Sequence, residues 1–180
     1  LNLWEFLLYV FCLTGMSNAT NLTDGLDGLL AGSYILTLGG FLCLMLSYQY
    51  ASGFSFVICV MISVISFFFF NRHPALIFMG DVGSTFLGGI LVACIFYQKN
   101  LEEFIAYFLL ASPLLFDSLF CLLRRVLSSQ NIFEPHKLHL YQRLHQSGCP
   151  SSHSGARLWF YACACMQLFC CHQQINFRKI

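Results

Sequence analysis

The chain has 180 residues and a formal net charge of +1; 58% of its residues are hydrophobic and only 9% are charged. A mean hydropathy of +0.70 excludes an ordinary soluble domain and is typical of a helical membrane protein. The near-zero charge gives no electrostatic basis for nucleic-acid binding. We therefore predict an all-α fold, a polytopic transmembrane helical bundle that forms a single membrane domain over residues 1–180, with no nucleic-acid partner.

Hydropathy and helix-breaking residues predict about six spans, because a spanning helix needs about 20 mostly apolar residues. In chain order they are Leu3–Met16, Leu29–Tyr48, Phe54–Phe70, Ser84–Tyr97, Phe104–Leu123 and Ala156–Cys171. The chain begins with Leu1 inside a hydrophobic run, so we expect an incomplete N-terminus. Pro113 predicts a kink in the fifth span.

The order of the spans predicts which connections share a membrane face. Each span crosses the bilayer once, so the connections Asn18–Gly28, Asn71–Gly83 and Arg124–Gly155 are expected on one side. That side carries six basic residues, and the other side carries three. The six are Arg72, Arg124, Arg125, Lys137, Arg143 and Arg157, against Lys99, Arg178 and Lys179. The positive-inside rule therefore predicts that the motif-bearing side is cytoplasmic.

The first polar stretch, NATNLTDGLDGLL, places Asp24 and Asp27 three residues apart between long apolar runs. At that spacing we expect both carboxylates on one face of a helix that begins near Thr23. Carboxylates in a membrane protein are costly and usually functional. The alternative is that Thr23 or Asp24 only caps the second span.

The second polar stretch, NRHPALIFMGDVGS, places Asp81 between Gly80 and Gly83, just before the fourth span. A carboxylate in such a turn can hold a hard cation through oxygen. The alternative is an ordinary helix cap by Asp81 or Ser84. Phe78 is either an interfacial anchor or a stacking platform for a flat ring, and the residues alone leave this open.

The third polar stretch, HKLHLYQRLH, places His136, His139 and Arg143 on one stripe of a short helix. With Lys137, Arg124 and Arg125 they form a basic pocket that suits phosphate groups. Contact with anionic lipid, or a zinc site from the two histidines, are the alternatives.

Acids that hold a divalent metal and cations that hold phosphates are together what phosphoryl transfer requires. The chain has no Walker A or GxSxG motif, which disfavours ATP-driven transport and serine hydrolysis. An ion-coupled transporter using Asp117 is the non-enzyme alternative, although transporters place such acids in mid-span. We expect Asp117 to support the site instead.

These three stretches, in this order, resemble the polyprenyl-phosphate N-acetylhexosamine-1-phosphate transferases over roughly residues 2–155. These are glycosyltransferase family 4 membrane enzymes, which include phospho-N-acetylmuramoyl-pentapeptide transferase. The resemblance implies a longer fold of about ten or eleven spans with an Asp-Asp motif upstream of Leu1, so the chain looks like the C-terminal part of that fold. Whether it is active alone, or is an inactive truncated relative, stays open.

The resemblance implies that N-acetylhexosamine-1-phosphate passes from a UDP-sugar to undecaprenyl phosphate with release of UMP, aided by Mg²⁺ or Mn²⁺. It implies that Asp81 binds the metal and that Asp24 and Asp27 are active-site acids, with Asp27 and Asn21 near the nucleotide. By the same resemblance, Asn71 and Phe78 match the family's uridine-pocket positions. His136, His139 and Arg143 match the histidine motif that lies at the diphosphate.

The third stretch also indicates a branch of the family. The peptidoglycan pentapeptide enzymes carry a consecutive histidine triplet where this chain has HKLHLYQRL. We therefore expect UDP-N-acetylglucosamine as donor, for the synthesis of lipopolysaccharide or another cell-surface glycan, with the pentapeptide transferase as the alternative. The expected location is the bacterial plasma membrane, with the active-site loops cytoplasmic. A homodimer is left open.

Overall fold

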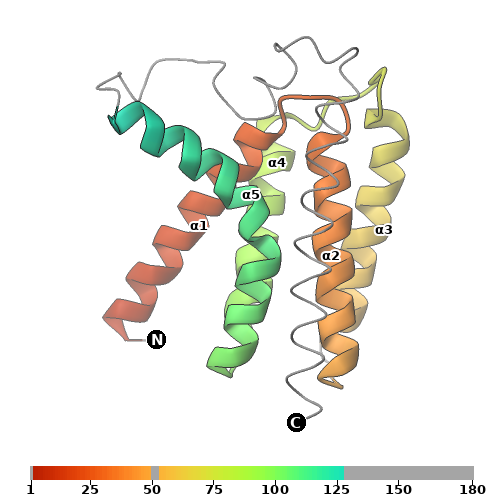
Figure 1. Cartoon of the computed structure of the whole chain (residues 1–180). Coiled ribbons are helices and arrows are strands. Elements are labelled where there is room, and N and C mark those ends of the chain that lie inside the picture. The colour runs from red at the N-terminus through yellow and green to blue at the C-terminus, as the bar shows by residue number, and fades with distance from the viewer. Residues whose placement is uncertain (1, 50–52, 128–180) are drawn as a thin grey trace.

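In the computed structural model, residues 2–49 and 53–127 are described, and they form five helices (Figure 1). These are α1 (Leu3–Thr23), α2 (Leu29–Ser47), α3 (Phe54–Asn71), α4 (Gly80–Phe96) and α5 (Leu101–Leu127). No strand occurs within these two ranges, so the prediction of an all-α fold is confirmed. The predicted sixth span, Ala156–Cys171, lies outside the described residues.

Helix α2 supplies much of the core. Tyr34, Leu38 and Phe41 on this helix are fully buried. The ring of Phe41 lies 4.6 Å from that of Tyr107 on α5, measured between ring centroids. Helix α3 packs along the other side of α2, and α1 packs along α4 (Figure 1). The bundle is thus held by side-chain packing between antiparallel neighbours.

Close backbone approach joins α1 to α4. A Cβ atom added at Gly88 would lie 2.6 Å from both Ser17 Cα and Thr20 Oγ1, so only glycine fits there. The hydroxyl of Thr20 donates a 2.8 Å hydrogen bond to the backbone oxygen of Ser84. Small residues and interhelical hydrogen bonds are the usual means of helix association in lipid, where burial of apolar surface gives little driving force.

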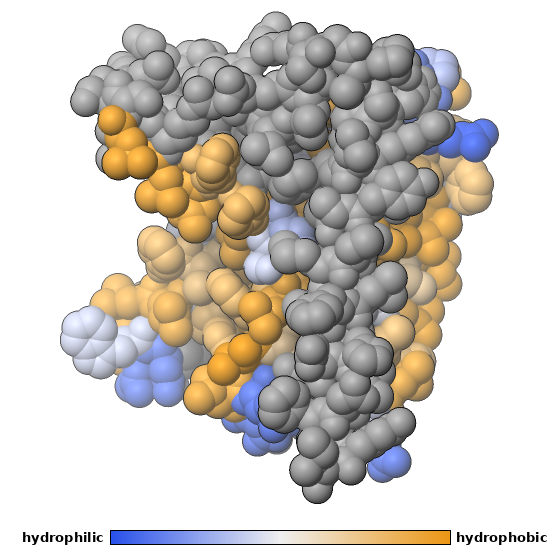
Figure 2. All heavy atoms as spheres, viewed as in Figure 1, coloured by the Kyte–Doolittle hydropathy of each residue, from blue (hydrophilic) through white to orange (hydrophobic). Residues whose placement is uncertain are grey.

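Two helices, α2 and α3, are long and apolar enough to cross a membrane, and α4 is apolar but shorter. Helix α3 leaves much of its apolar surface uncovered, including Phe56, Ile62 and Phe69. Figure 2 shows hydrophobic side chains over the middle of the bundle, with hydrophilic ones gathered mainly toward its ends. The described residues therefore have membrane-protein character, while the full number of spans stays a prediction.

The starts of α2 and α3 fall where the sequence predicts them, at Leu29 and Phe54. Four other boundaries, on three helices, were predicted well inside their helices. Helix α1 continues to Thr23 instead of Met16, α4 begins at Gly80 instead of Ser84, and α5 extends beyond Phe104–Leu123 at both ends. Polar side chains near these helix ends lower the local hydropathy, so the hydropathy pattern misses the ends. Thr20 and Thr23 still fit in the helix, because their hydroxyls lie within hydrogen-bond distance of the carbonyls of Met16 and Ala19.

The predicted kink also has a structural basis. Pro113 lies inside α5, and the helix changes direction midway along its length (Figure 1). Proline has no N–H to donate to the carbonyl four residues earlier, which here belongs to Leu109. The hydroxyl of Ser112 donates to that same oxygen over 2.7 Å. The freed backbone acceptor is therefore satisfied within the helix.

Candidate active site

The α1–α2 and α3–α4 connections lie at the same end of the bundle, as the order of the spans predicts (Figure 1). The first consists of residues 24–28 and the second of residues 72–79. The backbone N–H of Ala75 donates to Asp27 of the first connection, and that of Gly28 donates to Asn71, the last residue of α3, so the two connections are joined. Together with the adjoining turns of α1 and α4, they form the candidate site.

Asp24 and Asp27 do not share a helix face, so that prediction is wrong. Asp24 ends α1 as its C-cap, and Gly28 precedes α2 with a left-handed φ of +72°. A backbone that turns through a left-handed glycine cannot continue as one helix. No side chain caps α2, so the alternative role of Thr23 or Asp24 as its cap is not supported either.

Asp24 lies beside the start of α4, the helix that carries the predicted acid Asp81 in its first turn. The pKa of Asp24 is raised to about 6. Burial is the largest cause, the backbone N–H donated by Gly80 opposes it, and the charge of Asp81 adds to it. Gly80 has a φ of +70°, a conformation that glycine adopts without strain. Asp81 is in the first turn of α4 and does not cap it. The end of α1 and the start of α4 thus bring two carboxylates together.

This carboxylate pair is chemically suited to a hard divalent cation. Mg²⁺ is usually held by one or two carboxylates, with waters and substrate phosphates completing its shell. Within residues 2–49 and 53–127, no group of three or more His, Cys, Asp or Glu side chains forms a cage for a metal. The pair therefore fits a metal that arrives with a phosphate ligand better than a permanently enclosed metal.

Asn21, predicted near the nucleotide, lies in the last turn of α1. Its side-chain oxygen accepts a 2.8 Å hydrogen bond from the hydroxyl of Ser84. Ser84 is fully buried, and its hydroxyl also lies 3.0 Å from the backbone oxygen of Gly80. Ser84 thus links the two helix ends instead of capping α4.

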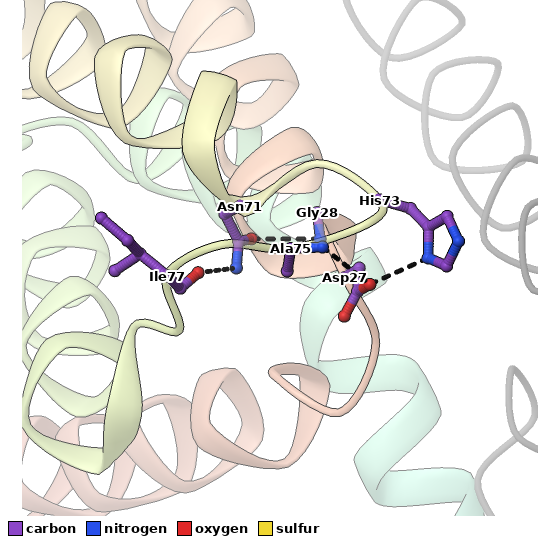
Figure 3. Close-up of polar contacts among 6 residues, drawn as sticks. All are labelled: Asp27, Gly28, Asn71, His73, Ala75 and Ile77. Atoms are coloured by element: carbon purple, nitrogen blue, oxygen red, sulfur yellow. Dashed lines mark hydrogen bonds and ion pairs between the residues drawn. The ribbon is translucent and has the colours of Figure 1, made fainter.

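Asn71, predicted in the uridine pocket, is 2% exposed at the end of α3. Its Oδ1 accepts from the backbone N–H of Gly28 over 3.0 Å, and its Nδ2 donates to the backbone oxygen of Ile77 over 2.9 Å (Figure 3). The side chain therefore bridges the two connections. Its contact with a nucleotide stays a prediction.

Asp27 also faces the second connection. Its Oδ2 lies 2.9 Å from Nδ1 of His73 and accepts from the backbone N–H of Ala75 over 3.1 Å (Figure 3). Sequence reasoning missed His73. The sequence does contain a signal for a role of His73. It is a titratable residue between two predicted site residues, Asn71 and Asp81, on a connection expected at the same side of the membrane as Asp27.

The remaining predicted residues are either exposed or outside the described ranges. The side chain of Phe78 is 71% exposed, and its neighbours Leu76 and Ile77 are also exposed. This position suits both an interfacial anchor and a stacking platform. His136, His139 and Arg143 lie outside the described residues, as does the side chain of Asp117.

A family model described as glycosyl transferase family 4 matches residues 1–99. The chain belongs to this family. The matched residues contain α1 to α4 and both connections of the candidate site, including Asp24, Asp27, Asn71 and Asp81. The resemblance stated from the motifs is therefore confirmed.

The chain is also similar to individual proteins with two different names. A "Probable undecaprenyl-phosphate N-acetylglucosaminyl 1-phosphate transferase" of Bacillus subtilis is 38% identical over 76% of this chain and 39% of its own length. A "Phospho-N-acetylmuramoyl-pentapeptide-transferase" of Bacillus pumilus is 47% identical over 52% of this chain and 29% of its own. The enzyme of that name from Chlamydia muridarum is 43% identical over 51% and 28%. The chain thus spans about two fifths or less of these relatives.

Proposed function

We propose that this chain carries the metal- and nucleotide-binding part of a sugar-1-phosphate transferase. The reaction moves N-acetylhexosamine-1-phosphate from a UDP-sugar to undecaprenyl phosphate and releases UMP. The observation that carries the proposal is that Asp24 accepts the backbone N–H of Gly80, the residue next to Asp81, where the Ser84–Asn21 hydrogen bond joins the ends of α1 and α4. Membership of glycosyl transferase family 4 supports the reaction class.

The proposed chemistry needs positioning and charge neutralisation more than a strong base. The phosphate of the lipid attacks the phosphorus attached to the sugar, the bond to the bridging oxygen breaks, and UMP leaves with that oxygen. A phosphate monoester has a second pKa of about 6, so the attacking oxygen is mostly ionised at neutral pH. The negative charge that the phosphates bring together must then be balanced.

Each part of the proposed site has a role in that balance. Asp24 and Asp81 would hold Mg²⁺ or Mn²⁺, which supplies charge neutralisation at the diphosphate. His136, His139 and Arg143 are proposed to hold the phosphates from the other side. The exposed ring of Phe78 is proposed to stack on uracil.

We propose UDP-N-acetylglucosamine as the donor. The name of the Bacillus subtilis relative supports this choice, as does the replacement of a histidine triplet by HKLHLYQRL. Phospho-N-acetylmuramoyl-pentapeptide transfer is the second candidate, supported by the names of the other two relatives. The two candidates differ in the donor that yields UMP.

The proposed location is the bacterial plasma membrane, with the site facing the cytoplasm, where UDP-sugars are made. Two membrane-capable helices support a membrane location, and the excess of basic residues near the predicted site supports the orientation.

The proposal is tested by UMP release. Membranes containing the chain, alone or co-expressed with the N-terminal portion of the Bacillus subtilis relative, are given undecaprenyl phosphate, Mg²⁺ and either donor. We expect UMP from UDP-N-acetylglucosamine that is abolished by EDTA and by Asp81→Asn. Glu102→Gln is the matched control, because Glu102 is an exposed acid in the first turn of α5. UMP release that survives Asp81→Asn would contradict the metal role.

A further inference from the structure

The α3–α4 connection, residues 72–79, leads directly from the end of α3 to the acid-bearing first turn of α4. It carries Phe78 and is followed by Gly80 and Asp81. Anything that fixes this segment against the α1–α2 connection also fixes these groups relative to Asp24. Three side chains do so, namely Asp27, Asn71 and His73, and we call them the loop clamp (Figure 3).

The contact between His73 and Asp27 is the outer half of the loop clamp. His73 Nδ1 and the backbone N–H of Ala75 meet the same carboxylate oxygen, Asp27 Oδ2, at 2.9 Å and 3.1 Å. An ionised carboxylate only accepts, so the ring donates from Nδ1. Two donors two residues apart therefore hold the start of the connection to one oxygen, across more than forty residues of sequence.

The inner half of the loop clamp is Asn71. It binds the backbone of Gly28 and of Ile77 from a buried position. A Cβ atom at Gly28 would lie 3.2 Å from the ring of Phe68 and 3.4 Å from Arg72 Cα, so the two segments are already in close contact. The contacts of Asp27 with His73 and Ala75 therefore add a second attachment of the connection, beside the one made by Asn71.

We infer that His73 is a positioning residue for the proposed transfer, acting through Asp27 to hold Phe78 and Asp81 in place relative to Asp24. The inference rests on the proposed function. Partners one shell away from a metal or a reacting group are often worth 10- to 100-fold in affinity or activity. Displacements of about 1 Å at such sites are enough to cause losses of this size.

The His73–Asp27 pair is partly exposed to solvent. The side chains of His73 and Asp27 are 42% and 28% exposed, so their mutual attraction is screened by solvent. We therefore expect the loss on removing His73 to come from the freed connection and not from the fold as a whole. The alternative is that His73 touches the diphosphate directly, and this alternative predicts no dependence on Asp27.

A double-mutant cycle separates these alternatives. The chain in nanodiscs is compared with His73→Ala, Asp27→Ala and the double variant, by titration with Mn²⁺ and UDP and by amide hydrogen exchange. We expect His73→Ala to weaken UDP binding roughly tenfold. In the Asp27→Ala background the same change should have less than about a twofold further effect, because contacting residues are strongly coupled.

Two further variants test the geometry. His73→Asn keeps an N–H donor near the position of Nδ1 and should restore most of the UDP affinity. Leu76→Ala is the matched control, because Leu76 is an apolar, exposed residue of the same connection. Hydrogen exchange at Ala75, whose N–H binds Asp27, should rise in His73→Ala and stay unchanged in Leu76→Ala.

The outcomes distinguish this inference from the proposed function. UDP binding that is unaffected by His73→Ala, or losses that simply add in the double variant, would overturn the positioning role while leaving the function intact. If the parent chain binds no UDP, yet exchange at Ala75 depends jointly on His73 and Asp27, the proposed function fails and the loop clamp itself is supported.

Discussion

The hydroxyl of Ser84 donates a 2.8 Å hydrogen bond to the side-chain oxygen of Asn21. This contact joins the first turn of α4, which carries Asp81, to the last turn of α1, which ends at Asp24. The Thr20 hydroxyl supports the same junction through the backbone oxygen of Ser84. The spacing of the two acids is therefore set by helix packing, so changes in that packing should affect both stability and the site.

Gly88→Ala should disrupt the α1–α4 junction. The new Cβ would lie 2.6 Å from Ser17 Cα, a backbone atom that cannot rotate away. Overpacking of this kind typically costs about 1–3 kcal/mol. Thermal unfolding in detergent should show a clear fall in Tm. The neighbouring Gly89→Ala is the control, since its Cβ would make an ordinary 3.7 Å contact with Leu13. Equal Tm values for the two variants would contradict the packing argument.

Asn71→Leu should loosen the joined connections. It leaves the N–H of Gly28 and the carbonyl of Ile77 without their side-chain partner. The Gly28 N–H is buried, and a buried unpaired group costs about 1–3 kcal/mol. We expect a lower Tm and faster hydrogen exchange at Gly28. Asn18→Leu, at an exposed position of α1, is the matched control. Slow exchange at Gly28 in the Asn71 variant would show that the amide side chain does not hold this turn.

Metal binding should weaken as pH falls through about 6. The pKa of Asp24 is raised mainly by burial, from an ordinary 3.8 to about 6. A divalent cation binds the ionised carboxylate, so protons compete with it below that pH. Electron paramagnetic resonance titration with Mn²⁺ should give an apparent Kd that rises by roughly tenfold per pH unit below 6 and is level above about 7. An affinity constant from pH 5 to 7 would contradict the assignment of Asp24.

The same raised pKa has an opposite consequence for stability without metal. The folded state binds the Asp24 proton more tightly than the unfolded state does. The stability that this proton supplies is fully present below about pH 3.8 and is lost as pH rises through about 6. Asp24→Asn should remove this component, so the difference in Tm between the variant and the parent chain should grow in favour of the variant from pH 4 to 7. A constant difference would be inconsistent with a buried carboxyl.

Phe78→Leu should weaken UDP binding if the ring stacks on uracil. Stacking of a base on an aromatic side chain is worth about 1–3 kcal/mol, which is roughly 5- to 150-fold in Kd. Phe78→Tyr keeps the π face and should bind UDP nearly as well as the parent chain. Because Phe78 is 71% exposed, neither change should alter Tm appreciably. Equal UDP affinity for the leucine and tyrosine variants would favour the interfacial-anchor role instead.

The sequence was sufficient to predict the helical class and the starts of α2 and α3. Apolar runs that follow glycine or other breakers give clear helix starts, as at Leu29 and Phe54. The C-terminal end of α1 and the start of α4 were misplaced, because their polar residues are typical of loops. The Thr20 hydroxyl meets the backbone oxygen of Ser84, and the Ser84 hydroxyl meets the side chain of Asn21, contacts between residues more than sixty positions apart.

The site was predictable as a set of acids but not as a geometry. The order of the spans alone predicts that Asp24 and Asp81 lie at the same end of the bundle. The i, i+3 spacing of Asp24 and Asp27 suggested a shared helix face, whereas a left-handed Gly28 leaves Asp27 in a turn that faces His73. Local spacing cannot show a contact that is made across the α3–α4 connection, and for that reason His73 was missed.

The most direct test of the central claim is Mn²⁺-dependent binding of UDP by this chain in nanodiscs. If Asp24 and Asp81 hold a metal that shares the nucleotide's phosphates, UDP should bind only with Mn²⁺ present. Asp24→Asn and Asp81→Asn should each weaken this binding by at least about tenfold, whereas Glu102→Gln should not change it. UDP binding that is independent of Mn²⁺, or unchanged in both aspartate variants, would contradict the account.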